Sequence, residues 1–228
     1  SRRLPAYAAP GKPLIPIPLL PEISGQRPDQ TLLDLQVTSY QRLLWFAPQH
    51  YRVMVTCGDV FVKTGSWLPP LPKADALVVG IKASIEEASR HGVMVVPSGN
   101  PQHLTSFLQK PDVNQLHNLS HNCDFFLDTG IWLLSEKAVA VLLKKCGLDL
   151  DSSLTGQQAP LPYDLFAEFG PAMGERPGIE DDDIQGLSSA VYPLTDARFY
   201  HFGTSPSMLT STCDLLRRPA AHRAFDDD

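Results

Sequence analysis

The chain has 228 residues, of which 43% are hydrophobic and 19% charged, and its formal net charge is −6. This length can bury a sizeable hydrophobic core, in one large domain or in two small ones. The modest acidity argues against a broad nucleic-acid-binding surface, although a local basic pocket remains compatible with it. The apolar runs are short and interrupted by proline, which excludes a transmembrane helix and gives no reason to expect a membrane partner.

The cysteines bear on the cellular compartment. They are widely spaced and form no Cys-x-x-Cys pair; they are Cys57, Cys123, Cys146 and Cys213. This usage is typical of reduced thiols in a cytosolic protein and not of a disulfide framework or a zinc site. The sequence therefore favours a cytoplasmic location.

The first half of the chain predicts a loop, a helix and several apolar strands. Residues 1–30 are rich in proline and predict a loop, whereas 31–46 predict an amphipathic helix. The β-branched segment 51–63 predicts a buried strand that ends at Cys57-Gly58-Asp59. Further strands are expected in 76–83, 91–96, 101–111 and 123–135, the last with a break at Asp128-Thr129-Gly130.

The second half adds helices and two more strands. Residues 136–147 predict a helix that ends at Gly147, and 164–174 predict another. The acidic run Glu180–Asp183 predicts a solvated loop. Strands are expected in 186–194 and 197–204, followed by a polar tail, 205–228. Strands that alternate with helices predict an α/β sheet covered on both sides.

The basic loop at the start of the chain carries the sharpest chemical signal. Arg2, Arg3 and Lys12 stand among prolines and small residues in a chain that is otherwise acidic. Arginine makes forked hydrogen bonds to phosphate oxygens, and lysine supplies a compact point charge. The pattern favours a phosphate clamp for a nucleoside triphosphate. The alternative is a basic, proline-rich surface arm.

Asp59 is a candidate metal ligand. It closes an apolar segment, and the carboxyl edge of an open α/β sheet is where such folds bind ligands. A carboxylate is a hard oxygen ligand that can hold Mg²⁺ against phosphates. The alternative is an ordinary turn or cap aspartate.

Two further segments end or interrupt apolar strands. The amide of Gln109 can bond sugar hydroxyls and the ammonium of Lys110 can bond a phosphate, although a surface lysine before Pro111 is commonplace. In Asp128-Thr129-Gly130, the glycine either lets a ligand approach closely or forms a β-bulge. Both interpretations stay open at this point.

Taken in order, these segments resemble the sugar nucleotidyltransferases. The signature of that family runs from a Gly-rich loop through Arg-Leu and a proline to a lysine followed by an apolar-Pro step. Arg3-Leu4-Pro5 and Lys12-Pro13-Leu14-Ile15-Pro16 match its second part. The resemblance is closer still to the L-fucose-1-phosphate guanylyltransferase region of the bifunctional fucokinase/GDP-fucose pyrophosphorylases. It covers essentially the whole chain through the ordered segments SRRLPAYAAPGK, GDVFV, HGV, LQKP, DTGIWLLS, YDLFAEFG and FYHFGTS.

The resemblance implies a fold and a domain organisation. We expect a Rossmann-like nucleotidyltransferase domain of the GT-A-like kind, a mixed α/β sheet with flanking helices, over 1–204, and a linker over 205–228. The first strand and Gly-rich loop of the family would lie upstream of Ser1, so we expect this piece alone to be unstable or inactive. A β-helix and a sugar kinase are expected downstream in the parent chain.

The resemblance also implies a reaction, in which GTP and L-fucose 1-phosphate give GDP-L-fucose and pyrophosphate. Catalysis then consists of positioning and charge neutralisation. Arg3 would stabilise the departing phosphates, with Arg2 as second candidate, and Lys12 would neutralise the phosphates at the reacting centre. Asp59 would hold Mg²⁺. His201 stands in the slot of a second metal aspartate, and it can ligate a metal although Mg²⁺ prefers oxygen.

The sugar-binding roles follow from the same resemblance. Gly92 would let the backbone approach the sugar. Gln109 stands where the family usually has Glu, and Asp128 stands where relatives carry a sugar-contacting Asn. Lys110 would bind the sugar phosphate.

Two alternatives remain at the level of the sequence. The chain can be a nucleotidyltransferase for another sugar 1-phosphate, or a non-catalytic nucleotide-sugar-binding domain of a fucokinase. The presence of Arg3, Lys12 and Asp59 favours an enzyme.

Overall fold

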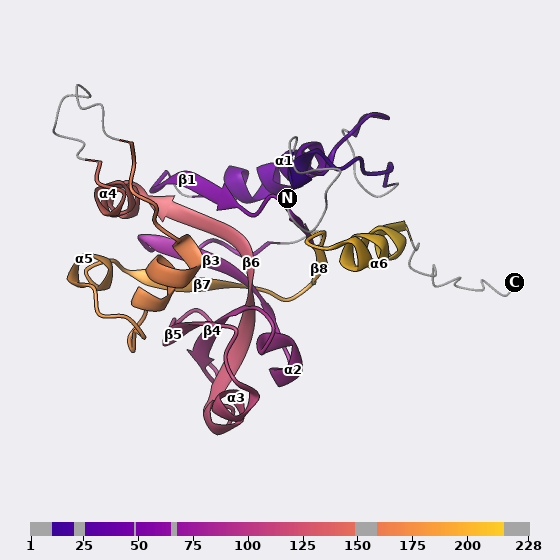
Figure 1. Ribbon diagram of the computed structural model, residues 1–228. Coiled ribbons are helices and arrows are strands. Elements are labelled where there is room, and N and C mark those ends of the chain that lie inside the picture. Colours follow the sequence, from indigo (N-terminus) through magenta and orange to yellow (C-terminus); the bar gives the residue numbers. More distant parts are fainter. Residues whose placement is uncertain (1–10, 21–25, 48, 65–67, 149–158, 217–228) are drawn as a thin grey trace, which may run out of the picture. The chain divides into compact units, whose positions relative to one another are not determined.

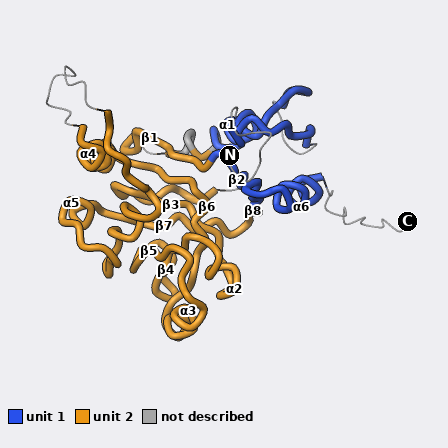
Figure 2. Tube along the Cα trace, in the orientation of Figure 1, with its two compact units in different colours: residues 1–42, 58–63, 198–228 blue, residues 43–57, 64–197 orange. Residues whose placement is uncertain are grey.

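The computed structural model describes residues 11–20, 26–47, 49–64, 68–148 and 159–216 (Figure 1). The chain divides into two compact units (Figure 2). Unit 1 comprises Ser1–Arg42, Gly58–Lys63 and Arg198–Asp228, and unit 2 comprises Leu43–Cys57 and Thr64–Ala197.

Unit 2 is built on a six-stranded mixed sheet. The strands β5 (Ser106–Gln109), β4 (Gly92–Pro97), β6 (Cys123–Ser135), β3 (Ala76–Lys82) and β7 (Ser189–Leu194) follow one another in that order, and β1 (Tyr51–Thr56) also pairs with β6. Only the β3–β7 pair is parallel; the other pairs are antiparallel. The long strand β6 thus contacts three neighbours (Figure 1). The expected mixed α/β sheet is confirmed.

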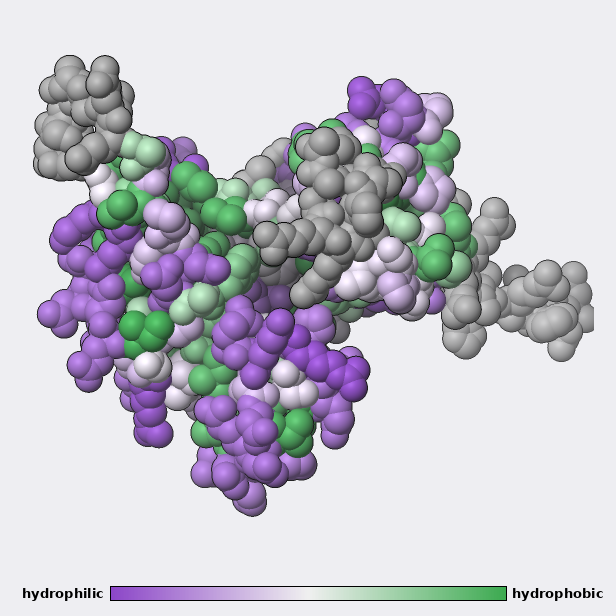
Figure 3. All heavy atoms as spheres, viewed as in Figure 1, coloured by the Kyte–Doolittle hydropathy of each residue, from purple (hydrophilic) through white to green (hydrophobic). Residues whose placement is uncertain are grey.

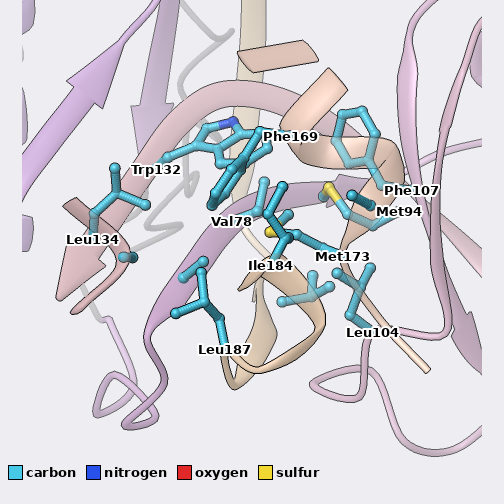
Figure 4. Packing of buried hydrophobic residues seen from close by; sticks show 14 of the residues in the cluster. Val78, Met94, Leu104, Phe107, Trp132, Leu134, Phe169, Met173, Ile184 and Leu187 are labelled. Atoms are coloured by element: carbon cyan, nitrogen blue, oxygen red, sulfur yellow. The ribbon is translucent and has the colours of Figure 1, made fainter. Parts of the chain in front are cut away.

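Alternating side chains of the strands feed two hydrophobic clusters. On one face, Val93 and Val95 of β4 pack with residues of α2 (Ile85–Ala88) and α3 (Val113–Leu119). On the other face, Met94 and Val96 join a larger cluster (Figure 4). This cluster includes residues of α4 (Glu136–Lys145), η3 (Leu165–Phe169), η4 (Gly170–Ala172) and α5 (Asp182–Gln185). A period of two sends successive strand residues to opposite faces, so the prediction of a sheet covered on both sides is confirmed.

The predicted helix 136–147 is present as α4. The Ser135 hydroxyl accepts a hydrogen bond from the amide of Ala138 and caps its start. Gly147, with a φ of 73°, follows its end in the left-handed region that suits glycine.

The segment 164–174 is not one α-helix. It forms a wide π-type turn, η3, followed by a 3-10 turn, η4. The carboxylate of Asp164 accepts from the amides of Phe166 and Ala167, and Pro171 has no amide to donate. A regular hydrogen-bond ladder therefore cannot continue through the segment.

The prediction of a solvated loop at Glu180–Asp183 is wrong for its last three residues. Asp181 caps α5 by accepting from the amide of Ile184, and it lies 2.7 Å from the ammonium of Lys145. Hydrogen bonds from Lys144 and Lys145 lower the pKa of Asp183. The two lysines stand in the last turn of α4, so the acidic run connects two helices.

The segment 51–63 is not one buried strand. It forms β1 in unit 2 and β2 (Val60–Thr64), which pairs with β8 (Ala197–His201) in a separate two-stranded sheet. The side chains of β1 are partly or fully exposed, whereas Val60, Phe61 and Val62 of β2 are buried.

The break at Asp128-Thr129-Gly130 is a bulge inside the continuous strand β6. The register of β6 against β3 shifts between Val78 and Gly80. Gly130 has a φ of 71°, and a Cβ atom there would lie 2.4 Å from the Sγ atom of Cys57. The bulge interpretation is confirmed, because Cys57 fills the space beside Gly130.

Unit 1 holds α1 (Leu32–Phe46) up to Arg42, the β2–β8 pair and α6 (Ser205–Leu216). Stacked rings of Tyr40, Phe61 and Tyr200 join α1 to both strands. The predicted helix 31–46 and the strand in 197–204 are confirmed. Helix α6 occupies the beginning of the predicted linker, 217–228 lie outside the described residues, and the domain boundary after residue 204 stays a prediction.

Figure 3 shows a mostly hydrophilic surface over α2 and α3 in unit 2. No helix among the described residues is both long enough and apolar enough to cross a membrane.

Candidate functional site

Three predicted site residues come together in unit 1. The Nζ atom of Lys12 lies 2.5 Å from the Oδ2 atom of Asp59, and the Nε2 atom of His201 lies 3.9 Å from the same oxygen. The three side chains are 20%, 25% and 34% exposed, respectively, so they remain open to a ligand. We call these residues the Lys12 cluster.

Local chain geometry explains how the Lys12 cluster forms. Lys12 opens the short turn η2 (Lys12–Leu14), which Gly11 precedes with a φ of 85°. A Cβ atom at Gly58 would lie 2.6 Å from the Cγ atom of Pro13, so glycine lets the turn before Asp59 pack against this proline.

His201 is brought to Asp59 by the pairing of β8 with β2. The amide of Phe202 donates to the backbone carbonyl of Asp59 at 2.7 Å. A Cβ atom at Gly203 would lie 2.3 Å from the His201 ring, so glycine leaves room for the imidazole.

The Lys12 cluster offers one hard oxygen ligand for a metal. The described residues contain no group of three or more His, Cys, Asp or Glu side chains that could hold a metal ion. Mg²⁺ on substrate phosphates commonly uses one or two protein carboxylates and keeps several waters. Asp59 fits such a role as a single carboxylate, whereas an imidazole nitrogen such as that of His201 suits Mg²⁺ poorly.

Three of the predicted sugar-binding residues form a row across unit 2. Gly92 pairs with Gln109 in the β4–β5 register, and the pairing of Val93 with Leu127 brings Gly92 beside Asp128. A Cβ atom at Gly92 would lie 3.4 Å from both the Cβ atom of Asp128 and the Oε1 atom of Gln109. A side chain at position 92 would stand between the two polar groups. We call Gln109, Gly92 and Asp128 the Gly92 row.

Asp128 is the one acid of this row, and its pKa is shifted. Its Oδ1 atom accepts hydrogen bonds from the amide of Gly130 at 2.8 Å and from the indole Nε1 of Trp132 at 3.1 Å. Burial raises the pKa of Asp128 to about 7, against the opposing effect of the two hydrogen bonds. The carboxyl group therefore changes its charge near neutral pH.

The remaining predicted residues are less constrained. Lys110 follows Gln109 at the exposed end of β5 with a φ of 47°, and its side chain makes no hydrogen bond or ion pair within the described parts of the chain. Arg2 and Arg3 lie outside the described residues.

Sequence reasoning gave no role to Trp132, which binds Asp128. The available signal was the spacing, because residues four apart on a strand face the same side. The bulge keeps Asp128 and Trp132 on the same side of the sheet, because it adds an even number of residues. Between the Val78–Trp132 and Gly80–Asp128 pairs, β6 has two more residues than β3.

Solved structures resemble the chain only distantly. HddC from Yersinia pseudotuberculosis has a TM-score of 0.40 and 12% identity, over 71% of this chain and 54% of that protein. The inositol-1-phosphate CTP transferase from T. maritima has a TM-score of 0.39 and 12% identity, over 82% and 64%. A likeness at this level does not identify a function.

Sequence relatives are more informative. A Bacteroides fragilis protein named "L-fucokinase/L-fucose-1-P guanylyltransferase" is 38% identical over 218 residues, which is 96% of this chain and 22% of that protein. An Arabidopsis thaliana "Bifunctional fucokinase/GDP-fucose pyrophosphorylase" is 26% identical over 236 residues, 92% of this chain and 22% of that protein. The chain therefore spans about a fifth of the length of these relatives.

The family comparison covers most of the chain. Residues 1–178 match the model of the fucose pyrophosphorylase domain. This match agrees with the resemblance in the ordered motifs and with both relatives, and it shows that the chain belongs to the fucose pyrophosphorylase domain family.

Proposed function

We propose that the chain transfers GMP from GTP to L-fucose 1-phosphate and releases pyrophosphate. Family membership and the names of both relatives support this activity. The observation that carries the proposal is the Lys12 cluster, in which a lysine and a carboxylate from distant segments meet at 2.5 Å. The ammonium of Lys12 can bind a phosphate oxygen, and the carboxylate of Asp59 can bind the cation that accompanies the phosphate.

The reaction is an in-line displacement at phosphorus. A phosphate oxygen of L-fucose 1-phosphate attacks the α-phosphorus of GTP and forms a new P–O bond. The bond from the α-phosphorus to the oxygen that bridges to the β-phosphate breaks, and pyrophosphate leaves with that electron pair. The protein contributes orientation and charge neutralisation, without a covalent intermediate.

Lys12 is the cation assigned to the reacting phosphates. Its ammonium has three donors, and one of them binds Asp59, so others stay available for phosphate oxygens. Arg3, with Arg2 as second candidate, would bind the departing phosphates because guanidinium groups match phosphate oxygens in pairs.

Asp59 would hold a magnesium ion bound with the nucleotide. Such an ion supplies charge neutralisation and orientation of the phosphate oxygens. His201 lies beside the same carboxylate, where it can hold Asp59 in place.

The Gly92 row is assigned to the sugar. Gln109 and Asp128 would bind sugar hydroxyls from two sides of Gly92, where the missing side chain leaves room. Lys110 would bind the sugar phosphate. By the family resemblance, Gln109 stands in place of a Glu and Asp128 in place of an Asn. The row therefore has one carboxyl group and one amide, as in the relatives, but in exchanged positions.

L-fucokinase activity, which both relatives carry in their names, would belong to other parts of a longer protein. The chain matches only 22% of each relative.

The test is pyrophosphate release by the full-length protein from GTP, Mg²⁺ and L-fucose 1-phosphate, with other sugar 1-phosphates alongside. Asp59→Asn and Lys12→Ala should abolish most of the release. Lys73→Ala, which removes an exposed lysine of unit 2, is the matched control and should leave it unchanged.

Two outcomes would contradict the proposal. Faster turnover of another sugar 1-phosphate would change the assigned substrate. A folded protein that binds GDP-L-fucose but releases no pyrophosphate with any sugar phosphate would be a nucleotide-sugar-binding domain.

A further inference from the structure

Trp132 is fixed in the larger hydrophobic cluster of unit 2. Its side chain is fully buried, and its ring centroid lies 5.6 Å from that of Phe107, 6.0 Å from that of Phe166 and 6.1 Å from that of Phe169. Figure 4 shows the indole beside Phe169 in this cluster. The ring therefore has little freedom to turn.

The polar atom of this ring serves Asp128. The indole Nε1 donates to Oδ1 of Asp128 at 3.1 Å, and the amide of Gly130 donates to the same oxygen at 2.8 Å. Two donors on one oxygen fix the orientation of the whole carboxyl group.

The second carboxyl oxygen is left for another partner. Oδ2 of Asp128 accepts no hydrogen bond from the described residues. Asp128 is partly exposed, and its Oδ2 is not among the fully buried side-chain atoms that lack a partner in the described ranges. A half-buried carboxyl group with one open oxygen can accept a hydrogen bond from a ligand hydroxyl.

The surroundings of Asp128 agree with a hydroxyl as that partner. Gly92 and Gln109 are its neighbours across the sheet, and neither carries a charge. Burial raises the pKa of Asp128 against the lowering effect of its two hydrogen bonds, and no charged neighbour contributes to the shift. Phe107 links Trp132 to Gly92. Its ring packs on Trp132, and its Cζ atom would lie 3.1 Å from a Cβ atom at Gly92.

We propose that Trp132 is a positioning residue for the sugar substrate: its indole N–H holds Oδ1 of Asp128 so that Oδ2 accepts a hydrogen bond from a sugar hydroxyl. The inference rests on the proposed function, because it takes the ligand of the Gly92 row to be a sugar phosphate. It assigns sugar recognition to a core residue that does not touch the sugar.

The principal test is Trp132→Phe in the full-length protein, with the dissociation constant of L-fucose 1-phosphate measured by calorimetry between pH 5.5 and 8.5. The variant keeps an aromatic ring and loses the donor. We expect about tenfold weaker binding of the sugar phosphate, as for one lost hydrogen bond to a charged group, with GTP binding unchanged. The indole lowers the pKa of Asp128, so its loss should move the inflection of the binding curve to higher pH.

Phe166→Leu is the matched control. It removes another ring that touches Trp132 and leaves the indole–carboxyl hydrogen bond in place. Its binding constant and inflection should match the wild type. If Phe166→Leu shifts both as much as Trp132→Phe does, the effect is general loosening of the core and the inference is wrong.

A second variant, Asp128→Ala, tests the inference if Trp132→Phe does not fold. Wild-type protein should bind one deoxy analogue of L-fucose 1-phosphate about tenfold more weakly, whereas Asp128→Ala should bind that analogue and the parent sugar phosphate equally. Equal losses in both proteins would overturn the inference.

The binding readout separates this inference from the proposed function. Binding that depends on Trp132 without pyrophosphate release would contradict the proposed function alone. Turnover with an unchanged dissociation constant in Trp132→Phe would contradict the inference alone. A wild-type protein without affinity for any sugar phosphate would contradict both.

Discussion

The Lys12 cluster in unit 1 is assembled by a turn and two short strands, whereas the Gly92 row in unit 2 lies on three adjacent strands of the six-stranded sheet. The first depends on a few local contacts, such as Pro13 against Gly58. The second is backed by the aromatic cluster around Trp132. Substitutions near the Lys12 cluster should therefore change chemistry without unfolding, while truncations in the aromatic cluster behind the Gly92 row should lower stability.

The largest expected effect is on the stability of unit 2. Phe169→Ala removes a fully buried ring that packs on Trp132, and it should lower the free energy of unfolding by about 3–5 kcal/mol. Urea denaturation followed by tryptophan fluorescence measures the change. Val113→Ala, at a position 40% exposed on α3, should cost less than about 0.5 kcal/mol. If both variants lowered the free energy of unfolding equally, the aromatic cluster behind the Gly92 row would have no special part in the stability of unit 2.

Lys12→Ala should have the next largest effect, and on catalysis alone. We expect kcat to fall about 10²–10³-fold, as for the loss of one preorganised charge-stabilising group. The unfolding transition should not move by more than about 1 kcal/mol, because the ion pair with Asp59 is partly exposed. Circular dichroism during heating, together with the pyrophosphate assay, would show whether catalysis and stability are separable here.

Asp128→Asn sharpens the comparison through pH. The pKa of Asp128 is raised from 3.8 to about 7 by burial in the folded state, so the folded protein binds more protons than the unfolded chain between these values. The contribution of Asp128 to stability is therefore present below pH 3.8 and is lost as the pH rises through about 7.

The amide variant removes this loss and keeps an acceptor for Gly130 and Trp132. At pH 8 it should be more stable than the wild type by about 1–3 kcal/mol, and the difference should vanish below pH 4. Urea titrations at the two pH values measure it. A gain that is the same at both would mean that ionisation of Asp128 is not its source.

Gly58→Ala should give the smallest of these effects. The added methyl group would lie 2.6 Å from the ring of Pro13, which must then shift together with the turn that carries Lys12. We expect kcat to fall about tenfold, as for a small misplacement of a catalytic group. Gly178→Ala is the control, because its nearest atom would be 3.8 Å away, and it should retain full activity.

Much of the molecule could be predicted from the sequence. Apolar runs gave strands β3 and β4 at nearly correct bounds, because buried strands are uniformly apolar. Spacing and family motifs together singled out Lys12 and Asp59, which the structure brings together.

Other features depend on contacts that no local pattern records. The apolar segment 51–63 predicted one strand, yet it divides between the two units because β2 finds its partner in β8. The cap of Asp164 depends on two hydrogen bonds from backbone amides, and that of Asp181 depends on one. The role of Trp132 was missed because an aromatic ring in an apolar strand predicts only a core residue. The hydrogen bond from its indole Nε1 to Asp128 is seen only in the structure.

The hydrogen bond between Trp132 and Asp128 gives the protein a built-in spectroscopic probe. Each tryptophan contributes one indole N–H signal to the proton NMR spectrum, and Trp132→Phe identifies the one that belongs to position 132. That resonance should follow the ionisation of Asp128 as the pH changes. The proposed binding of L-fucose 1-phosphate beside Asp128 should then be visible through a single proton, without turnover and without a labelled substrate.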